Sequence, residues 1–234
     1  MILMKLSETT QNILKNYSTI NQSIFLKKGT RLSTISVMRN ILSASDVSET
    51  FPVDFCIYDL GKFLNLLKIY PELDFHEKYV MMSNGEKTYK FMAAESSIIV
   101  FVENTFEMDN SKNNPEGSKK APNWDINVKL PHETLSTINQ VASISGLPDY
   151  SLSTKDGVVY FSALDKKDDT SNVSEEPVGE SDDPFTMYFR SENLKLIEGD
   201  YDVSISKNKI STFRHQKLPI QYWITLEQDS TYGA

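Results

Sequence analysis

The chain lacks the features that mark disulfide-stabilised or membrane-spanning proteins. Cys56 is the single cysteine among 234 residues, which excludes an intrachain disulfide and favours a reducing compartment. No stretch approaches the roughly 18 consecutive apolar residues that a membrane span requires. The opening residues 1–5 lack the basic flank and the cleavage site of a signal peptide. With 39% hydrophobic and 24% charged residues, the composition is that of an ordinary folded protein.

Sequence motifs for catalysis or cofactor binding are also missing. Neither glycine-rich phosphate-binding pattern occurs, and the nine glycines are scattered. The three histidines are isolated and form no metal-ligand spacing. Paired acids occur only in a polar stretch, where burial cannot raise a carboxyl pKa. We therefore expect no catalytic residue, no metal and no cofactor, which favours a binding or structural protein over an enzyme.

The net charge of −8 is unevenly distributed. Residues 165–183 hold eight acids and two lysines, a local charge of −6 that leaves −2 for the rest of the chain. This stretch contains Pro177 and no aromatic residue, and Pro184 follows it, so it is predicted to be a solvated loop. Basic patches elsewhere on the surface are therefore compatible with the acidic total.

A change in composition divides the chain nearly in half. Residues 110–120 have many turn-forming residues and no hydrophobic periodicity, which is typical of a linker. The sequence thus predicts an N-terminal domain over 1–108, a linker over 109–123 and a C-terminal domain over 124–234.

The two halves share a pattern that indicates duplication. A Lys-Leu pair precedes an amphipathic stretch in each half, at Lys5 and at Lys129, with the same spacing to a closing isoleucine. Hairpin turns are expected near Gly29, Gly85 and Gly157. Few residues are identical, but their shared order and offsets favour two similar domains.

Helical periodicity predicts four short amphipathic helices, two in each half. They are expected at about 8–17, 59–69, 131–143 and 190–198. Ser7 is placed to cap the first helix. Apolar residues at helical spacing are expected to be buried, including Leu64 on the second helix and Val141 on the third. The opposite faces are polar, and several of them carry lysine.

Motifs at both ends of the chain resemble the sliding clamp of T-even-type bacteriophages. They comprise Met4-Lys5-Leu6-Ser7 with Leu14-Lys15-Asn16-Tyr17, then Asp54-Phe55-Cys56-Ile57-Tyr58-Asp59-Leu60, and the closing run Tyr222-Trp223-Ile224-Thr225-Leu226-Glu227. The likeness spans nearly the whole chain and is weakest between Met81 and Asn123.

The resemblance implies an α+β DNA-clamp fold. Each of its two similar domains would contain two strand-helix-strand units, with helices lining the inner face and antiparallel sheets outside. Three copies would close into a homotrimeric ring that encircles double-stranded DNA without reading its sequence. The implied partners are the replicative DNA polymerase, which the clamp would make processive, and an ATP-dependent clamp loader. A coactivator role in late transcription is also implied, as is a location in the cytoplasm of the infected bacterial host.

Basic residues on the polar helix faces are the candidates for contact with DNA, because phosphate contacts are independent of sequence. They are Lys5, Lys15, Lys62, Lys68, Arg190 and Lys195. The family's partner-peptide pocket suggests a second set near the linker and the chain end, namely Phe106, Trp124 and Tyr232. The principal alternative is a non-catalytic, β-rich structural protein of the phage virion, and a hydrolase with an unrecognised site ranks below both.

Overall fold

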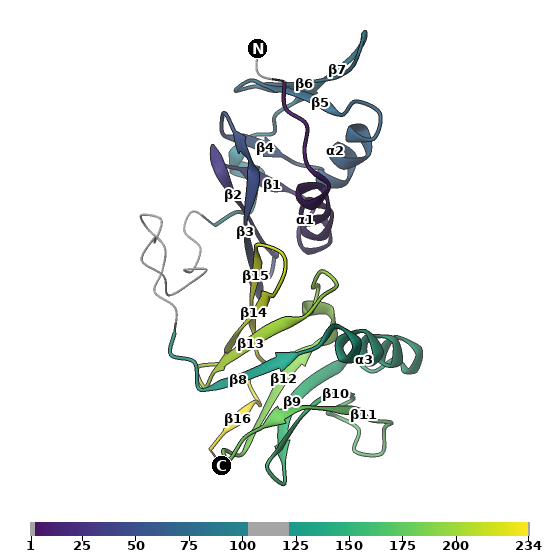
Figure 1. The fold of residues 1–234 in the computed structure, drawn as a ribbon, viewed down its shortest axis with the longest axis vertical. Helices are drawn as coiled ribbons and strands as arrows, with labels where there is room; N and C mark the ends of the chain where they lie inside the picture. The colour runs from purple at the N-terminus through teal and green to yellow at the C-terminus, as the bar shows by residue number, and fades with distance from the viewer. Residues whose placement is uncertain (1–2, 103–121, 234) are drawn as a thin grey trace. The chain divides into compact units, whose positions relative to one another are not determined.

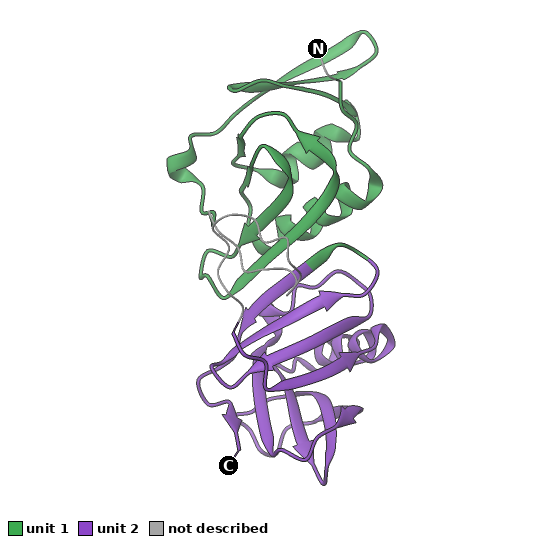
Figure 2. Cartoon of the chain, turned by 60° about the vertical axis from the view of Figure 1, so that its left-hand side comes forward, with its two compact units in different colours: residues 1–120, 218–220 green, residues 121–217, 221–234 purple. Residues whose placement is uncertain are grey.

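The computed structural model describes residues 3–102 and 122–233. Within them the chain forms two compact units (Figure 2). Unit 1 comprises residues 1–120 and 218–220, and unit 2 comprises residues 121–217 and 221–234. The predicted linker, 109–123, lies almost entirely outside the described residues, so its limits stay a prediction.

Two helices of unit 1 form where the periodicity predicts them. In α1 (Glu8–Ile20), the hydroxyl of Ser7 accepts a hydrogen bond from the Thr10 amide at 3.2 Å, which confirms the predicted cap. In α2 (Leu60–Leu67), Asp59 accepts from the Lys62 amide at 2.8 Å. The prediction that Leu64 is buried is wrong, because this residue borders the space between the two helices and is only half-buried.

The strands of unit 1 pair antiparallel in three groups (Figure 1). In the first group β1 (Ile24–Leu26) pairs with β4 (Phe55–Ile57), and in the second β2 (Gly29–Ile35) pairs with β3 (Ile41–Phe51). The third group is a sheet of β5 (Glu72–Phe75), β6 (Tyr79–Asn84) and β7 (Lys87–Met92). A 3-10 turn, η1 (Ser96–Ile98), follows β7. The strand pair predicted around Gly29 exists as β1 and β2, but each pairs with a different strand. Gly85 makes the predicted β6–β7 turn with φ +65°, a conformation that glycine adopts without strain.

Unit 2 carries two groups of antiparallel strands. The first has the order β11-β10-β9-β12-β16, with β9 (Asp149–Lys155), β10 (Val158–Leu164), β11 (Ser174–Glu180), β12 (Phe185–Arg190) and β16 (Thr231–Tyr232). The second has the order β8-β13-β14-β15, with β8 (Ile126–Leu130), β13 (Tyr201–Ser206), β14 (Ile210–His215) and β15 (Ile220–Thr225). Large side chains such as Phe161, Phe213 and Trp223 are almost fully buried.

The single α-helix found in the described part of unit 2 is α3 (His132–Ser145). Pro131 stands at its start, and Gly146 ends it in the left-handed conformation with φ +67°. Leu135 and Ile138 are buried as predicted. Val141 is only half-buried, because Ala142 takes the inward position on the last turn. The α3 helix packs on β10 and β11.

The predicted fourth helix over 190–198 is wrong. Arg190 ends β12, a 3-10 turn η2 (Ser191–Asn193) follows, and the next residues are not helical. The residue that directly precedes the predicted helix is Phe189, which is fully buried in β12 and has no side-chain acceptor for a capping hydrogen bond. The Ile197 amide donates to the Tyr222 hydroxyl at 3.3 Å, and its carbonyl accepts from the Tyr201 hydroxyl at 2.5 Å. The two tyrosine hydroxyls thus bind the amide and the carbonyl of Ile197, which in a helix would bond to other backbone groups of the same segment.

The acidic stretch 165–183 is not a loop throughout, so that prediction is also corrected. Its middle forms β11, which pairs with β10 as the last strand of the sheet. The ammonium group of Lys155 forms an ion pair with Glu175, which offsets part of the local negative charge. An edge strand tolerates both charge and proline, because one of its sides faces solvent.

Candidate nucleic-acid interface

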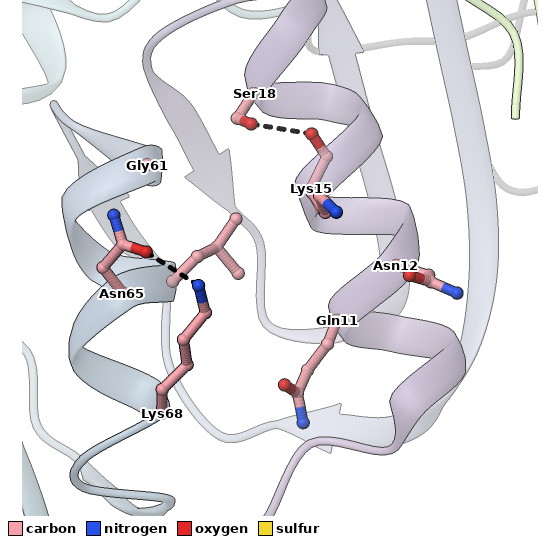
Figure 3. A pocket seen from close by; sticks show the side chains of 8 residues that line it. Gln11, Asn12, Lys15, Ser18, Gly61, Asn65 and Lys68 are labelled. Atoms are coloured by element: carbon pink, nitrogen blue, oxygen red, sulfur yellow. Dashed lines mark hydrogen bonds between the residues drawn. The ribbon is translucent and has the colours of Figure 1, made fainter.

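A polar trough lies between α1 and α2 in unit 1 (Figure 3). Its volume is about 320 Å³, and it is open to solvent. The lining residues are Gln11, Asn12, Lys15 and Ser18 from α1, Gly61, Leu64 and Asn65 from α2, and Lys68, the residue that caps the C-terminus of α2. All but Gly61 and Leu64 have polar side chains, and the lining contains no carboxylate.

The trough follows from the same spacing on both helices. Gln11, Lys15 and Ser18 stand at positions i, i+4 and i+7 of α1, and Gly61, Asn65 and Lys68 repeat this spacing on α2. Residues at this spacing lie on one face of a helix. The opposite faces hold buried side chains, such as Tyr17 on α1 and Phe63 on α2, which anchor both helices on the core.

Positive charge in the trough is not neutralised by acids. The ammonium group of Lys68 donates to the Asn65 side-chain oxygen at 3.0 Å, and the Ser18 hydroxyl donates to the Lys15 carbonyl at 2.7 Å (Figure 3). Within residues 3–102 and 122–233, no carboxylate forms an ion pair with Lys15, Lys62 or Lys68. Amide, hydroxyl and ammonium donors of this kind suit the phosphate oxygens of a nucleic acid.

The six residues predicted to face DNA do not all lie in this trough. Lys15 and Lys68 lie on its two walls, and Lys62 lies on another flank of α2, beside a hollow bounded by Tyr58 and Tyr89. Lys5 precedes α1, and its ammonium group forms an ion pair with Glu72 at 3.2 Å.

The remaining two predicted residues belong to unit 2 and to no helix. Arg190 ends β12, where its guanidinium contacts Glu227 at 3.4 Å and Asp149 at 3.9 Å. Lys195 is half-buried just beyond η2. Because a phosphate would have to compete with the two carboxylates for Arg190, this residue is a weak candidate for DNA contact.

The residues predicted from the sequence to face DNA omit the uncharged polar members of the trough, which are Gln11, Asn12, Ser18 and Asn65. The signal for Gln11 and Ser18 is their helical spacing relative to Lys15, but a prediction based on positive charge alone leaves out amides and hydroxyls. The relation between Lys15 and Lys68 required the packing of α1 against α2, which the sequence does not encode locally.

The described structure does not test the pocket predicted from three residues. Phe106 lies outside the described residues. Trp124 is half-buried ahead of β8. Tyr232 is held in β16 opposite Phe185, and the hydrogen bond that its hydroxyl donates to Asp183 at 2.8 Å raises the Tyr232 pKa. The pocket therefore stays a prediction.

Residues 3–102 and 122–233 contain no cluster of three side chains suited to hold a metal ion. No helix within them is both long and apolar enough to span a bilayer.

Burial raises the pKa of the Cys56 thiol, and the nearby carboxylates of Asp54 and Glu95 raise it further. The thiol therefore has the environment of a structural residue rather than that of a nucleophile.

Known structures share the fold of this chain at low sequence identity. A PCNA2–PCNA3 complex from Sulfolobus tokodaii matches with a TM-score of 0.65 at 14% identity, covering 97% of this chain and 98% of that one. A DnaN sliding clamp from Pseudomonas aeruginosa also matches with a TM-score of 0.65, at 10% identity, covering 97% of this chain and 65% of that one. These likenesses establish the α+β fold of DNA clamps.

Relatives that are similar in sequence identify the family of this chain more specifically than the shared fold does. The DNA polymerase processivity factor family matches residues 5–73. A sliding clamp of Vibrio phage KVP40 is 32% identical over 96% of this chain and 99% of its own length. The sliding clamp of Enterobacteria phage T4 is 23% identical over 98% of this chain and 99% of its own length. No relative supports the alternative of a virion structural protein. The chain belongs to the sliding-clamp family of DNA polymerase processivity factors encoded by T4-like phages.

Proposed function

We propose that this chain assembles as a homotrimeric ring, encircles duplex DNA and tethers the replicative polymerase to its template. The observation that carries the proposal is the acid-free polar trough between α1 and α2, combined with membership of the clamp family. In this proposal the trough faces the duplex. Its amide and hydroxyl groups and its two lysines contact phosphates directly or through water.

The chemistry of the trough suits movement along DNA. Phosphate contacts have similar energies at each step of the duplex, since they do not depend on base sequence. No aromatic side chain lines the trough, so none can stack on a base or wedge between bases there. The ring would therefore be held by its closed topology rather than by a tight grip.

Further partners complete the proposed role. A closed ring cannot thread onto circular DNA, so an ATP-dependent loader must open it. The chain itself acts as a non-catalytic accessory factor in the cytoplasm of the infected bacterial cell, where polymerase and template meet. Family membership supports these partners, and a role in late transcription is proposed on the same basis.

A primer-extension assay on primed circular DNA tests the function. With its cognate polymerase, loader and ATP, the wild-type chain should lengthen the products. Combined Lys15→Glu, Lys62→Glu and Lys68→Glu substitutions should lower the amount of loaded clamp about tenfold or more at physiological salt, because three phosphate attractions become repulsions. The variant should still sediment as a trimer.

A control variant carries the same change of charge away from the helices, at Lys27, Lys28 and Lys217, which are exposed in turns. It should load and extend as the wild type does. Equal loading by both variants would refute the assignment of the α1–α2 trough. A wild-type trimer that gives no gain in product length with its own polymerase and loader would refute the clamp function itself.

A further inference from the structure

Residues 227–233 form a strap along the outer edge of β12 in unit 2 (Figure 1). The part of the strap that is β16 pairs with the first two residues of β12. Further along, the Glu227 amide donates to the Tyr188 carbonyl at 2.9 Å, and the Tyr188 amide donates to the Ser230 hydroxyl at 3.0 Å. The strap thus satisfies backbone groups that β12 would otherwise expose at the edge of its sheet.

The strap has no buried hydrophobic side chain. Of residues 227–233, all of which the structure describes, only Ser230 is buried, and its side chain is polar. Leu226, directly before the strap, is buried in the core. Burial of apolar surface is the main favourable force in folding. A segment without it has low local stability and can open while the rest of the unit stays folded.

Ion pairs to one lysine hold the strap in place. The side chain of Lys166, which is only 9% exposed, forms ion pairs with Asp229 at 2.8 Å and with Glu227 at 3.5 Å. Its ammonium group also lies over the Tyr188 ring, 5.2 Å from the ring centre. Burial alone would lower the Lys166 pKa, but the hydrogen bond to Asp229 and the surrounding carboxylates raise it above its ordinary value. Lys166 thus joins the segment between β10 and β11 to both the strap and β12.

A buried carboxylate lies beside these ion pairs. Asp149 is 1% exposed, accepts a hydrogen bond from the Lys166 amide at 3.3 Å and lies 3.9 Å from the Arg190 guanidinium. Arg190 also contacts Glu227 at 3.4 Å, so three carboxylates share two cations. Loss of the Lys166 charge would leave the three carboxylates around one guanidinium. Asp149 cannot reach water, whereas the Asp229 side chain is already 56% exposed, so movement of the strap into solvent is the least costly response.

We propose that the strap is a latch controlled by Lys166, whose ion pairs hold the strap on the edge of β12 and whose loss releases it while unit 2 stays folded. The open form exposes the Tyr188 amide and carbonyl at the edge of the sheet, where they can pair with another strand. The latch is a property of one segment in a single chain. It therefore depends neither on ring formation nor on the trough between α1 and α2.

Hydrogen exchange of the full chain carrying Lys166→Met tests the latch. Methionine keeps an unbranched apolar side chain at this position and removes the charge. The amides of Tyr188, Glu227 and Gly233 should exchange about tenfold or more faster than in the wild type, because the strap is open for a larger fraction of the time. Amides of β9 and β10 should keep their wild-type rates, since unit 2 stays folded.

A matched control removes a different lysine of unit 2. Lys155 also forms an ion pair, with Glu175, and also lies over a tyrosine ring, that of Tyr160, at 5.7 Å from the ring centre. Lys155→Met should leave exchange in the strap at the wild-type rate. The charge argument has its own test in a triple variant that combines Lys166→Met with Glu227→Gln and Asp229→Asn. It should recover most of the protection, because the strap then carries no charge for Asp149 to repel.

Three results would overturn the latch. The first is exchange in the strap that is no faster with Lys166→Met than with Lys155→Met. The second is acceleration of the β9 and β10 amides to the same extent as the strap, which would show that Lys166 supports the whole unit. The third is a triple variant whose strap stays as open as that of Lys166→Met, which would show that charge is not the cause.

Discussion

At the residue scale, Gly199 shows how one position can depend on a distant side chain. Its φ is +152°, and a Cβ placed there would lie 2.2 Å from Nε2 of His215. That nitrogen donates to the Glu198 carbonyl at 3.1 Å, while Nδ1 accepts from the Lys217 amide at 3.0 Å. Both ring nitrogens are thus satisfied in the neutral imidazole, and a side chain at residue 199 would displace the ring.

Gly199→Ala should therefore lower the free energy of unfolding by about 2–4 kcal/mol, through backbone strain and displacement of His215. Urea denaturation measures this loss. Gly146→Ala is the matched control, since Gly146 also has positive φ but has open space around it. It should cost only about 1 kcal/mol. Equal losses for the two variants would show that contact with His215 is not the cause.

At the element scale, the start of α1 is held by an acid from β3. The Ser7 amide donates to Glu49, and the Thr10 hydroxyl donates to the other carboxylate oxygen of Glu49 at 2.6 Å. Burial alone would raise the Glu49 pKa, but these hydrogen bonds outweigh it and hold the pKa below its ordinary value. A negative charge at a helix N-terminus is also favourable. Glu49 thus joins the cap of α1 to the sheet beneath it.

Glu49→Gln should lower the free energy of unfolding by roughly 1 kcal/mol at pH 7, measured by chemical denaturation. A carboxyl group whose pKa is depressed by folding stabilises the folded state above its unfolded pKa. It loses that contribution as pH falls through the folded pKa. The difference between variant and wild type should therefore shrink below about pH 4. A difference that is constant from pH 7 to pH 3 would contradict the ionic role of Glu49.

At the scale of the whole molecule, the proposed ring should retain DNA by topology. Loaded clamp should stay on a nicked circle and leave within a much shorter time once the circle is cut, because a sliding ring runs off a free end. We expect linearisation to shorten its lifetime about tenfold or more at constant salt, measured by gel filtration of labelled protein on DNA. A protein bound by phosphate contacts alone would show equal lifetimes on both forms.

Local sequence was sufficient for several elements. The caps and periodic apolar residues of α1 and α2 specify those helices without reference to the rest of the chain. Gly85 and Gly157 likewise specify hairpin turns, since positive φ is accessible to glycine at no cost. The sequence also determined which helix faces are polar, and the family motifs at its two ends indicate a clamp.

Other features were decided only by the tertiary structure, because they depend on contacts between residues that are distant in the sequence. The segment 190–198 has helical spacing, but hydroxyl groups from Tyr201 and Tyr222 bind its backbone, and no helix forms. The charge of the acidic stretch predicts a loop, but the middle of the stretch forms β11, because it pairs with β10. Lys15 and Lys68 share one trough because two helices distant in sequence pack together, whereas Arg190 meets carboxylates instead. The spacing of residues along the sequence determines which of them share a helix face, but only the packing of the elements determines which residues that face contacts.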